Sequence, residues 1–196
     1  KYGFQPRHIL VLKNQDATRA TILDGLQKQL IDEAHAGDVC VFYFAGHGSQ
    51  VVNSKSTEPD LKDEALVPAD SPQGAAYIRD KELARLYHKA LDKGVFLTVI
   101  IDSCHSRSSS RGFPLRRTAR TVEPDLLDVA EKPDAGPAPE QRGALVLTAA
   151  QDLQESVEIE DDHGKTHGAF SWGLFQSLRH ASVQESAEQI FSRVKA

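Results

Sequence analysis

Residues 39–45 read VCVFYFA and are followed at once by the short polar segment GHGS at residues 46–49. A second apolar run, VFLTVII at residues 95–101, is followed by DSCHS at residues 102–106. Continuous apolar runs of this length are typical of strands that are buried on both faces of a parallel sheet. We therefore expect both polar turns at the carboxyl edge of one sheet, which is where α/β proteins place their ligand sites.

Further short strands and amphipathic helices are expected around these two runs. Apolar runs at residues 8–13 (HILVLK) and 144–149 (ALVLTA) indicate buried strands. Long polar stretches without periodicity indicate a loop over residues 50–73 and a flexible insert over residues 107–142. Alternating strands and helices predict an α/β domain around a mostly parallel sheet. Apolar residues recur at helical spacing over residues 16–36, over 81–91 behind a cap at Asp80, and over 169–178 and 185–194.

Composition describes an ordinary globular chain. With 196 residues, 40% hydrophobic and 26% charged, we expect one domain over residues 1–196. A net charge of -5 disfavours a nucleic-acid partner, because phosphate contacts need a concentrated basic face. No apolar run reaches the 18 residues of a membrane span, and the two cysteines indicate a reducing, cytoplasmic setting. The chain contains no Met, so we expect it to be part of a longer or processed protein.

The two polar turns carry the residue types needed for thiol chemistry. Cys104 follows one strand and His47 the other, so an imidazole and a thiol are expected at the same sheet edge. A thiolate is a strong nucleophile when a base stands beside it. Taken alone, Cys104 could be a small buried cysteine and His47 a loop histidine. The hypothesis of thiol chemistry therefore rests on the two residues together. Cys40, at the start of its strand, fits the buried reading and would lie far from Cys104.

These motifs resemble a known family. Residues 41–50 (VFYFAGHGSQ) are similar to the histidine motif of caspase-like peptidases, and residues 99–106 (VIIDSCHS) to the cysteine motif of metacaspases and their bacterial relatives. The resemblance implies a caspase-like three-layer sandwich, with about six strands in the sheet, helices on both faces and a first strand that would precede Lys1. It continues through residues 63–70 (DEALVPAD), 147–151 (LTAAQ) and 167–172 (HGAFSW).

The resemblance implies roles for particular residues in a cysteine endopeptidase. Cys104 would be the nucleophile and His47 the general base and acid, with the amides of Gly48 and Cys104 as oxyanion donors. Asp102 would line the pocket for an Arg or Lys side chain of the substrate, since a buried carboxylate matches a guanidinium or ammonium. A turn-capping role for Asp102 stays open. Ala45, where many metacaspases carry Ser, and Asp152 are further pocket candidates.

Calcium is a further implication of the resemblance. Asp63 and Asp80 match two positions of an aspartate cluster that binds an activating calcium ion in some metacaspases. Lys81 stands where a second consecutive aspartate is usual, and a lysine repels a cation. No cofactor is required for the chemistry, and solvated loop charges are the alternative reading of these aspartates.

Other outcomes remain open at this stage. The Arg-rich insert would be a target for self-processing if the enzyme cleaves after Arg, and otherwise an uncleaved loop. A catalytically silent scaffold is a second function, and a zinc site built from both cysteines, His47 and His105 is a third, although its spacing fits no common zinc pattern. The expected partner is a polypeptide with a basic residue at the cleavage site, recognised by a monomer or by a chain regulated by flanking domains.

Overall fold

A parallel sheet of three strands forms the centre of the molecule. The computed structural model describes residues 2–103, 122–132, 136–149, 158–161, 164–182 and 184–194. The sheet has the order β1-β5-β6, with β1 at Val39–Ala45, β5 at Phe96–Asp102 and β6 at Leu145–Thr148. All of its pairings are parallel. The predicted α/β class and the strands at residues 39–45, 95–101 and 144–149 are therefore confirmed to within one or two residues.

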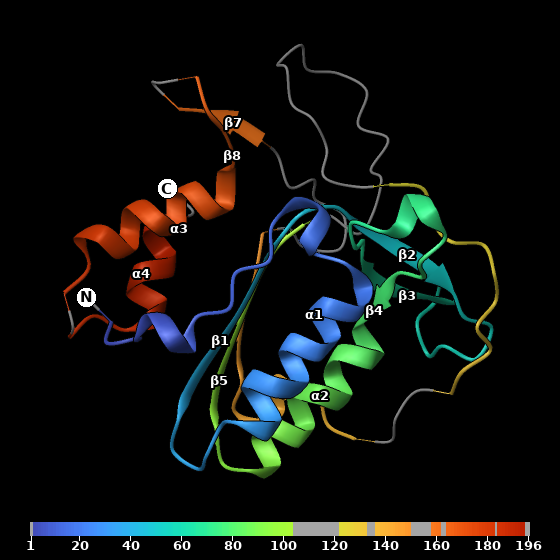
Figure 1. The fold of residues 1–196 in the computed structure, drawn as a ribbon, viewed down its shortest axis with the longest axis horizontal. Coiled ribbons are helices and arrows are strands. Elements are labelled where there is room, and N and C mark those ends of the chain that lie inside the picture. Colours follow the sequence, from blue (N-terminus) through green and yellow to red (C-terminus); the bar gives the residue numbers. More distant parts are fainter. Residues whose placement is uncertain are drawn as a thin grey trace.

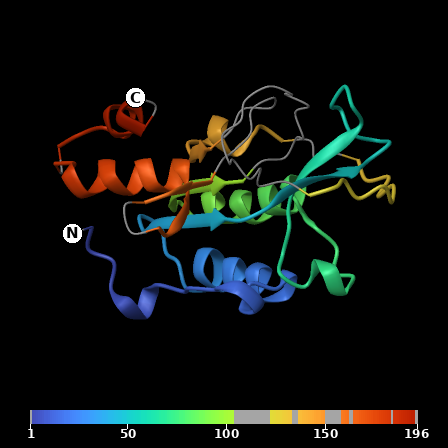
Figure 2. The same cartoon turned by 90° about the horizontal axis from the view of Figure 1, so that it is seen from above.

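Helices cover both faces of this sheet. Figure 1 shows α1 (Arg19–Leu26) and α2 (Asp80–Asp92) on one side of β1 and β5, and α3 (Ala169–His180) and α4 (Ala187–Val194) on the other. Figure 2 shows the same layers from above. The buried cluster lies between the sheet and the first helix pair, because the apolar stripes of α1 and α2 meet the inward side chains of β5. Its members include Ile22, Leu26, Leu83, Ala90, Leu97 and Val99.

Two smaller antiparallel sheets complete the fold. The first has the order β2-β3-β4, with β2 at Gly48–Val52, β3 at Lys62–Leu66 and β4 at Ile78–Arg79. The second pairs β7 (Glu158–Glu160) with β8 (Thr166–Gly168). The prediction of one long loop over residues 50–73 is wrong, because β3 buries the polar Asp63 and its sequence KDEAL lacks the apolar alternation of a typical strand.

Three expectations about the sheet need correction. Among the described residues the central sheet has three strands, not about six. Residues 9–13 form no strand, and the side chains of Ile9, Leu10 and Val11 are about half exposed, because no strand pairs with this segment. β1 is not buried on both faces: Val41 and Tyr43 are exposed and line an open apolar groove that also reaches α3 and α4.

The predicted helices are confirmed, with changes at their ends. Thr18 caps α1, since its hydroxyl oxygen accepts a hydrogen bond from the Thr21 amide at 3.2 Å. The helix then continues as a π-helical turn, η3, over Gln27–Asp32. Asp80 is the first residue of α2 and not its cap. The start of α2 is instead held by Glu82, whose carboxylate accepts from the Arg79 amide at 3.1 Å.

Much of the segment predicted as a flexible insert packs against the body of the domain. Residues 122–129 run alongside β2, with the Val52 amide donating to the Asp125 carbonyl at 3.0 Å and the Asp125 amide to the Gln50 carbonyl at 2.8 Å. A short 3₁₀ helix, η5, follows at Pro139–Arg142. The expectation for residues 107–142 is therefore wrong for these parts, while residues 107–121 lie outside the described residues. This packing depends on hydrogen bonds to residues that lie far away in the sequence, and such partners leave no local pattern in the segment itself.

None of the helices in the described part of the chain is both long and apolar enough to cross a membrane.

Candidate active site

The two strands that precede the predicted catalytic residues end side by side. In the parallel register, Ala45 lies opposite Asp102, and each is the last residue of its strand. The Gly46 amide donates to the Asp102 carbonyl at 3.2 Å, so the pairing continues one residue beyond β1. Because parallel strands present their carboxyl ends at one edge, Gly46 and Ser103, the residues that follow the two strands, leave the sheet at the same edge. This is the edge at which α/β sheets carry their sites.

His47 lies in the turn between β1 and β2, and its side chain is exposed. Its carbonyl accepts a hydrogen bond from the Val67 amide at 3.0 Å, which fixes the turn against the end of β3. Gly48 is buried and opens β2 opposite Leu66. Gly46 is needed for close approach, since a Cβ atom there would lie 2.9 Å from the ring of Phe44. The backbone around His47 is therefore held on both sides.

Asp102 is fully buried, and its carboxylate is bound by a residue of the helix α3. Oδ2 accepts a hydrogen bond from the Ser171 amide at 3.1 Å and a second one from the Ser171 hydroxyl. Ser171 lies in the first turn of α3, where a carboxylate also interacts favourably with the helix dipole. The Tyr43 hydroxyl lies 2.6 Å from the same Ser171 oxygen. Asp102 thus ties α3 to the sheet edge, a contact that the sequence reading did not foresee.

Two predicted site residues fall where the structure gives no description. Cys104 follows Ser103, the last described residue before the gap, and Ser103 is buried. Asp152 lies between β6 and β7, also outside the described residues. Ala45 is described and is exposed at the end of β1. The structure therefore describes His47, Gly48, Asp102 and Ala45 at the edge, while the position of the proposed nucleophile stays a prediction.

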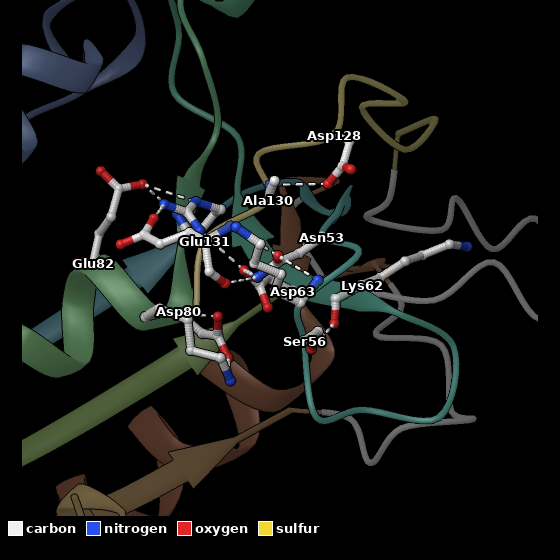
Figure 3. Close-up of polar contacts among 12 residues, drawn as sticks. Asn53, Ser56, Lys62, Asp63, Asp80, Glu82, Asp128, Ala130 and Glu131 are labelled. Atoms are coloured by element: carbon white, nitrogen blue, oxygen red, sulfur yellow. Dashed lines mark hydrogen bonds and ion pairs between the residues drawn. The ribbon is translucent and has the colours of Figure 1, made fainter. Parts of the chain in front are cut away.

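A buried network of charges lies beyond this edge, where the smaller sheet meets α2. The Asp63 side chain is completely buried, and its Oδ2 accepts from Arg79 at 3.0 Å and from the Asn53 amide group at 2.9 Å. Arg79 also pairs with Glu131, as does Arg85 at 2.8 Å. Figure 3 shows Asp63 close to Asn53 and Glu131, while the amine of Lys62 points away from them.

The predicted calcium residues belong to this network. Lys81, which follows Asp80 at the start of α2, places its Nζ 3.0 Å from Asp80 Oδ2, and the other Asp80 oxygen accepts from the Lys81 amide at 2.7 Å. Calcium takes six to eight oxygen ligands. Within the described residues only Asp63 Oδ1 lacks a partner among the oxygens of Asp63 and Asp80, and no group of three or more acidic, His or Cys side chains converges. The residues present do not fit a calcium ion.

Arg79, Asn53 and Ser171 are the polar residues that sequence reasoning missed. Arg79 and Asn53 are buried, and both hold Asp63, which lies 16 and 10 residues away. Ser171 reaches Asp102 across 69 residues. The sequence carries no signal for this role, because the burial of Arg79 appears only in the structure, where an arginine is almost never buried without a partner. The identity of its partner needs the packed structure.

Comparison with known proteins matches this architecture. The family description "Metacaspase, peptidase C14 domain" matches residues 2–110. Metacaspase-1A of Aspergillus niger is 39% identical over 99% of this chain and 58% of its own length, and Metacaspase-1A of Aspergillus oryzae is 37% identical over 99% and 56%. A crystal structure of a Geobacter sulfurreducens protein shares the fold, with a TM-score of 0.64 at 21% identity over 94% of this chain and 71% of that one.

The fold and the paired turns define a caspase-like α/β domain. The chain belongs to the metacaspase family, in its peptidase C14 domain. It spans a little over half the length of the Aspergillus metacaspases that it matches.

Proposed function

We propose that this domain is a cysteine endopeptidase in which Cys104 is the nucleophile and His47 the general base and acid. The observation that carries the proposal is the pairing of Ala45 with Asp102 at the ends of two parallel strands. Each catalytic residue follows its strand's last residue by two positions. Family membership supports the same assignment.

The proposed reaction runs through a thioester. His47 takes the proton from the Cys104 thiol, and the thiolate attacks the carbonyl carbon of the scissile peptide bond. The amides of Gly48 and Cys104 stabilise the negative oxygen that forms. The C–N bond then breaks, and the amine leaves with the proton from His47. A water molecule, deprotonated by His47, hydrolyses the thioester and releases the carboxylic acid, and the proton returns to the thiol.

The proposed specificity is for a basic residue before the cleaved bond. Asp102 supplies a buried negative charge at the correct edge of the sheet, with Ala45 exposed beside it and Asp152 as a further candidate. Ser171 already donates to one carboxylate oxygen. An arginine or lysine side chain would therefore bind to a carboxylate that is held in place before the substrate arrives, which lowers the cost of ordering the pocket.

Self-processing is part of the same proposal. Arg107, Arg111, Arg116, Arg117 and Arg120 all follow Cys104 closely in sequence and lie outside the described residues. Arg142 is different, because it is the last residue of η5 and its guanidinium pairs with Asp92 at 2.6 Å. Cleavage after one of the first five is the expected event, and Arg142 is the least suitable site.

The test uses fluorogenic peptides that end in Arg, Lys, Asp or Leu before the reporter. Cys104→Ala and His47→Ala should each abolish cleavage, while Cys40→Ala, at the far end of β1, should keep it. A peptidyl inhibitor that alkylates thiols should label Cys104 and not Cys40. Unchanged activity in Cys104→Ala would refute the assignment. A folded wild-type protein that neither cleaves nor becomes labelled would favour the silent scaffold.

A further inference from the structure

The strongest feature outside the proposed active site is the charge arrangement at the start of α2. Asp63, from β3, lies close enough to Asp80, from α2, that its charge raises the pKa of Asp80. The pKa of Asp80 is raised, first because of burial and then because of Asp63, and Lys81 opposes this rise. The Asp63 side chain is completely buried, whereas that of Asp80 is 40% exposed, so the buried carboxylate has the greater need of a compensating positive charge.

Lys81 meets that need from within the chain. Its Nζ binds Asp80 Oδ2 at 3.0 Å, and its side chain is 22% exposed. Burial alone lowers the pKa of Lys81, but the nearby Asp80, Asp63 and Glu58 more than reverse the effect, so the pKa is raised. The ammonium is therefore held charged among three acidic groups.

Arg79 completes the balance on the other side of Asp63, with a 3.0 Å contact to Oδ2. The two carboxylates thus face two fixed cations. A divalent ion brought to this place would meet the fixed charges of Arg79 and Lys81, and it would have to displace the Lys81 ammonium from the Asp80 oxygen that it binds. Figure 3 labels Asp63 and Asp80 among the residues of this network.

We propose that the Lys81 ammonium acts as a built-in counter-ion for the Asp63–Asp80 pair, in the place that a divalent cation would otherwise take. The domain is therefore stabilised without calcium at this site, and removal of the Lys81 charge converts the pair into a site that gains stability from calcium. The unpartnered oxygen of Asp63 and the released oxygen of Asp80 would be the first two ligands of that ion.

The test compares melting temperatures in millimolar CaCl₂, MgCl₂ and ionic-strength-matched KCl, without any substrate. Wild type and Lys81→Arg, which keep the charge, should show no calcium-specific shift. Lys81→Met should melt at a lower temperature in KCl and recover part of the loss in CaCl₂. Lys89→Met, an exposed lysine on the same helix, is the matched control and should follow wild type. If Lys81→Met folds too poorly to melt, its refolding yield with and without calcium gives the same readout.

Two results would overturn the proposal. One is saturable calcium binding by the wild-type domain, measured by calorimetry and lost in Asp63→Asn. The other is a Lys81→Met variant whose stability and calcium response match those of Lys89→Met. Neither measurement depends on peptide cleavage, so this inference can fail while the proposed peptidase function stands, and the reverse also holds.

Discussion

Arg79 lies 3.0 Å from Asp63 and joins β4 to β3 through an ion pair in which the Asp63 side chain has no exposed surface. The same guanidinium also contacts Glu131, so one side chain links the small sheet, the start of α2 and the segment that follows residue 121. Such a pair is strongly destabilising to break, because the remaining charge is left buried and uncompensated.

Replacement of Arg79 tests this link. We expect Arg79→Met to lower the free energy of unfolding by about 3 to 5 kcal/mol, because Asp63 loses its main partner while its side chain stays without exposed surface. Urea unfolding followed by circular dichroism measures the change. Arg142→Met is the control: its partner Asp92 is 66% exposed, so the expected loss is below about 1 kcal/mol. Equal losses in the two variants would contradict the structural role of Arg79.

Asn53 makes a second testable connection. Its amide group donates to Asp63 at 2.9 Å and to the Glu131 carbonyl at 2.8 Å, and its oxygen accepts from the Glu131 amide at 3.1 Å. Asn53→Ala removes these three hydrogen bonds, at a cost of about 0.5 to 1.5 kcal/mol each. We expect faster cleavage after Glu131 by a glutamate-specific protease in Asn53→Ala, measured by mass spectrometry. The exposed Gln73→Ala should digest like wild type, and an unchanged rate in Asn53→Ala would rule out the tether.

The buried Tyr87 side chain predicts a loss of stability at alkaline pH. Its side chain is buried near Phe42, its hydroxyl has no hydrogen-bond partner within the described part of the chain, and burial raises its pKa. A folded-state pKa above the unfolded value of about 10 gives stability that is present below pH 10 and is lost as the pH rises beyond it. The loss amounts to about 1.4 kcal/mol per pH unit.

Tyr87→Phe removes both the titration and the unpaired hydroxyl. We expect its stability at pH 7 to equal or exceed that of wild type, and its decline above about pH 10 to be shallower. Thermal unfolding at several pH values measures both effects. Superimposable alkaline profiles for the two proteins would show that the hydroxyl has a partner or is reached by water.

Variants of Asp102 and Ser171 can distinguish two roles of Asp102, recognition of the substrate and anchoring of α3. Asp102→Asn can still accept from Ser171 but lacks the charge for a basic side chain. We expect kcat/KM for Arg and Lys reporters to fall on the order of 10²-fold, since the loss of a buried charge partner costs about 2 to 5 kcal/mol. Labelling of Cys104 by a small uncharged thiol reagent should persist, because the dyad is untouched.

Ser171→Ala is the matched variant for that experiment. It removes the hydroxyl contact to Asp102 and keeps the carboxylate, so its stability should fall while its preference for Arg and Lys stays. If both variants lose stability equally and neither changes the order of preferred reporters, Asp102 is an anchor of α3 alone.

Much of the architecture follows from local pattern. The three central strands and the four helices were predicted to within a few residues, because apolar runs and helical periodicity report burial directly. The predictions failed where burial depends on a neighbour: residues 9–13 are apolar but have no strand beside them, and β1 leaves Val41 and Tyr43 exposed. The hairpin of β2 and β3 was missed because its polar side chains are buried by partners that come from far along the chain.

The amino-acid sequence by itself determined the two apolar strands, the turns that carry His47 and Cys104, and the family to which the chain belongs. Only the tertiary structure decided that Ala45 pairs with Asp102, that Ser171 binds the Asp102 carboxylate, and that Arg79 pairs with Asp63 and Lys81 with Asp80. The physical reason is the distance along the sequence over which each kind of interaction acts. Strand and helix signals arise from neighbours in sequence, whereas the partner of a buried charge is chosen by the packing of elements that lie tens of residues apart.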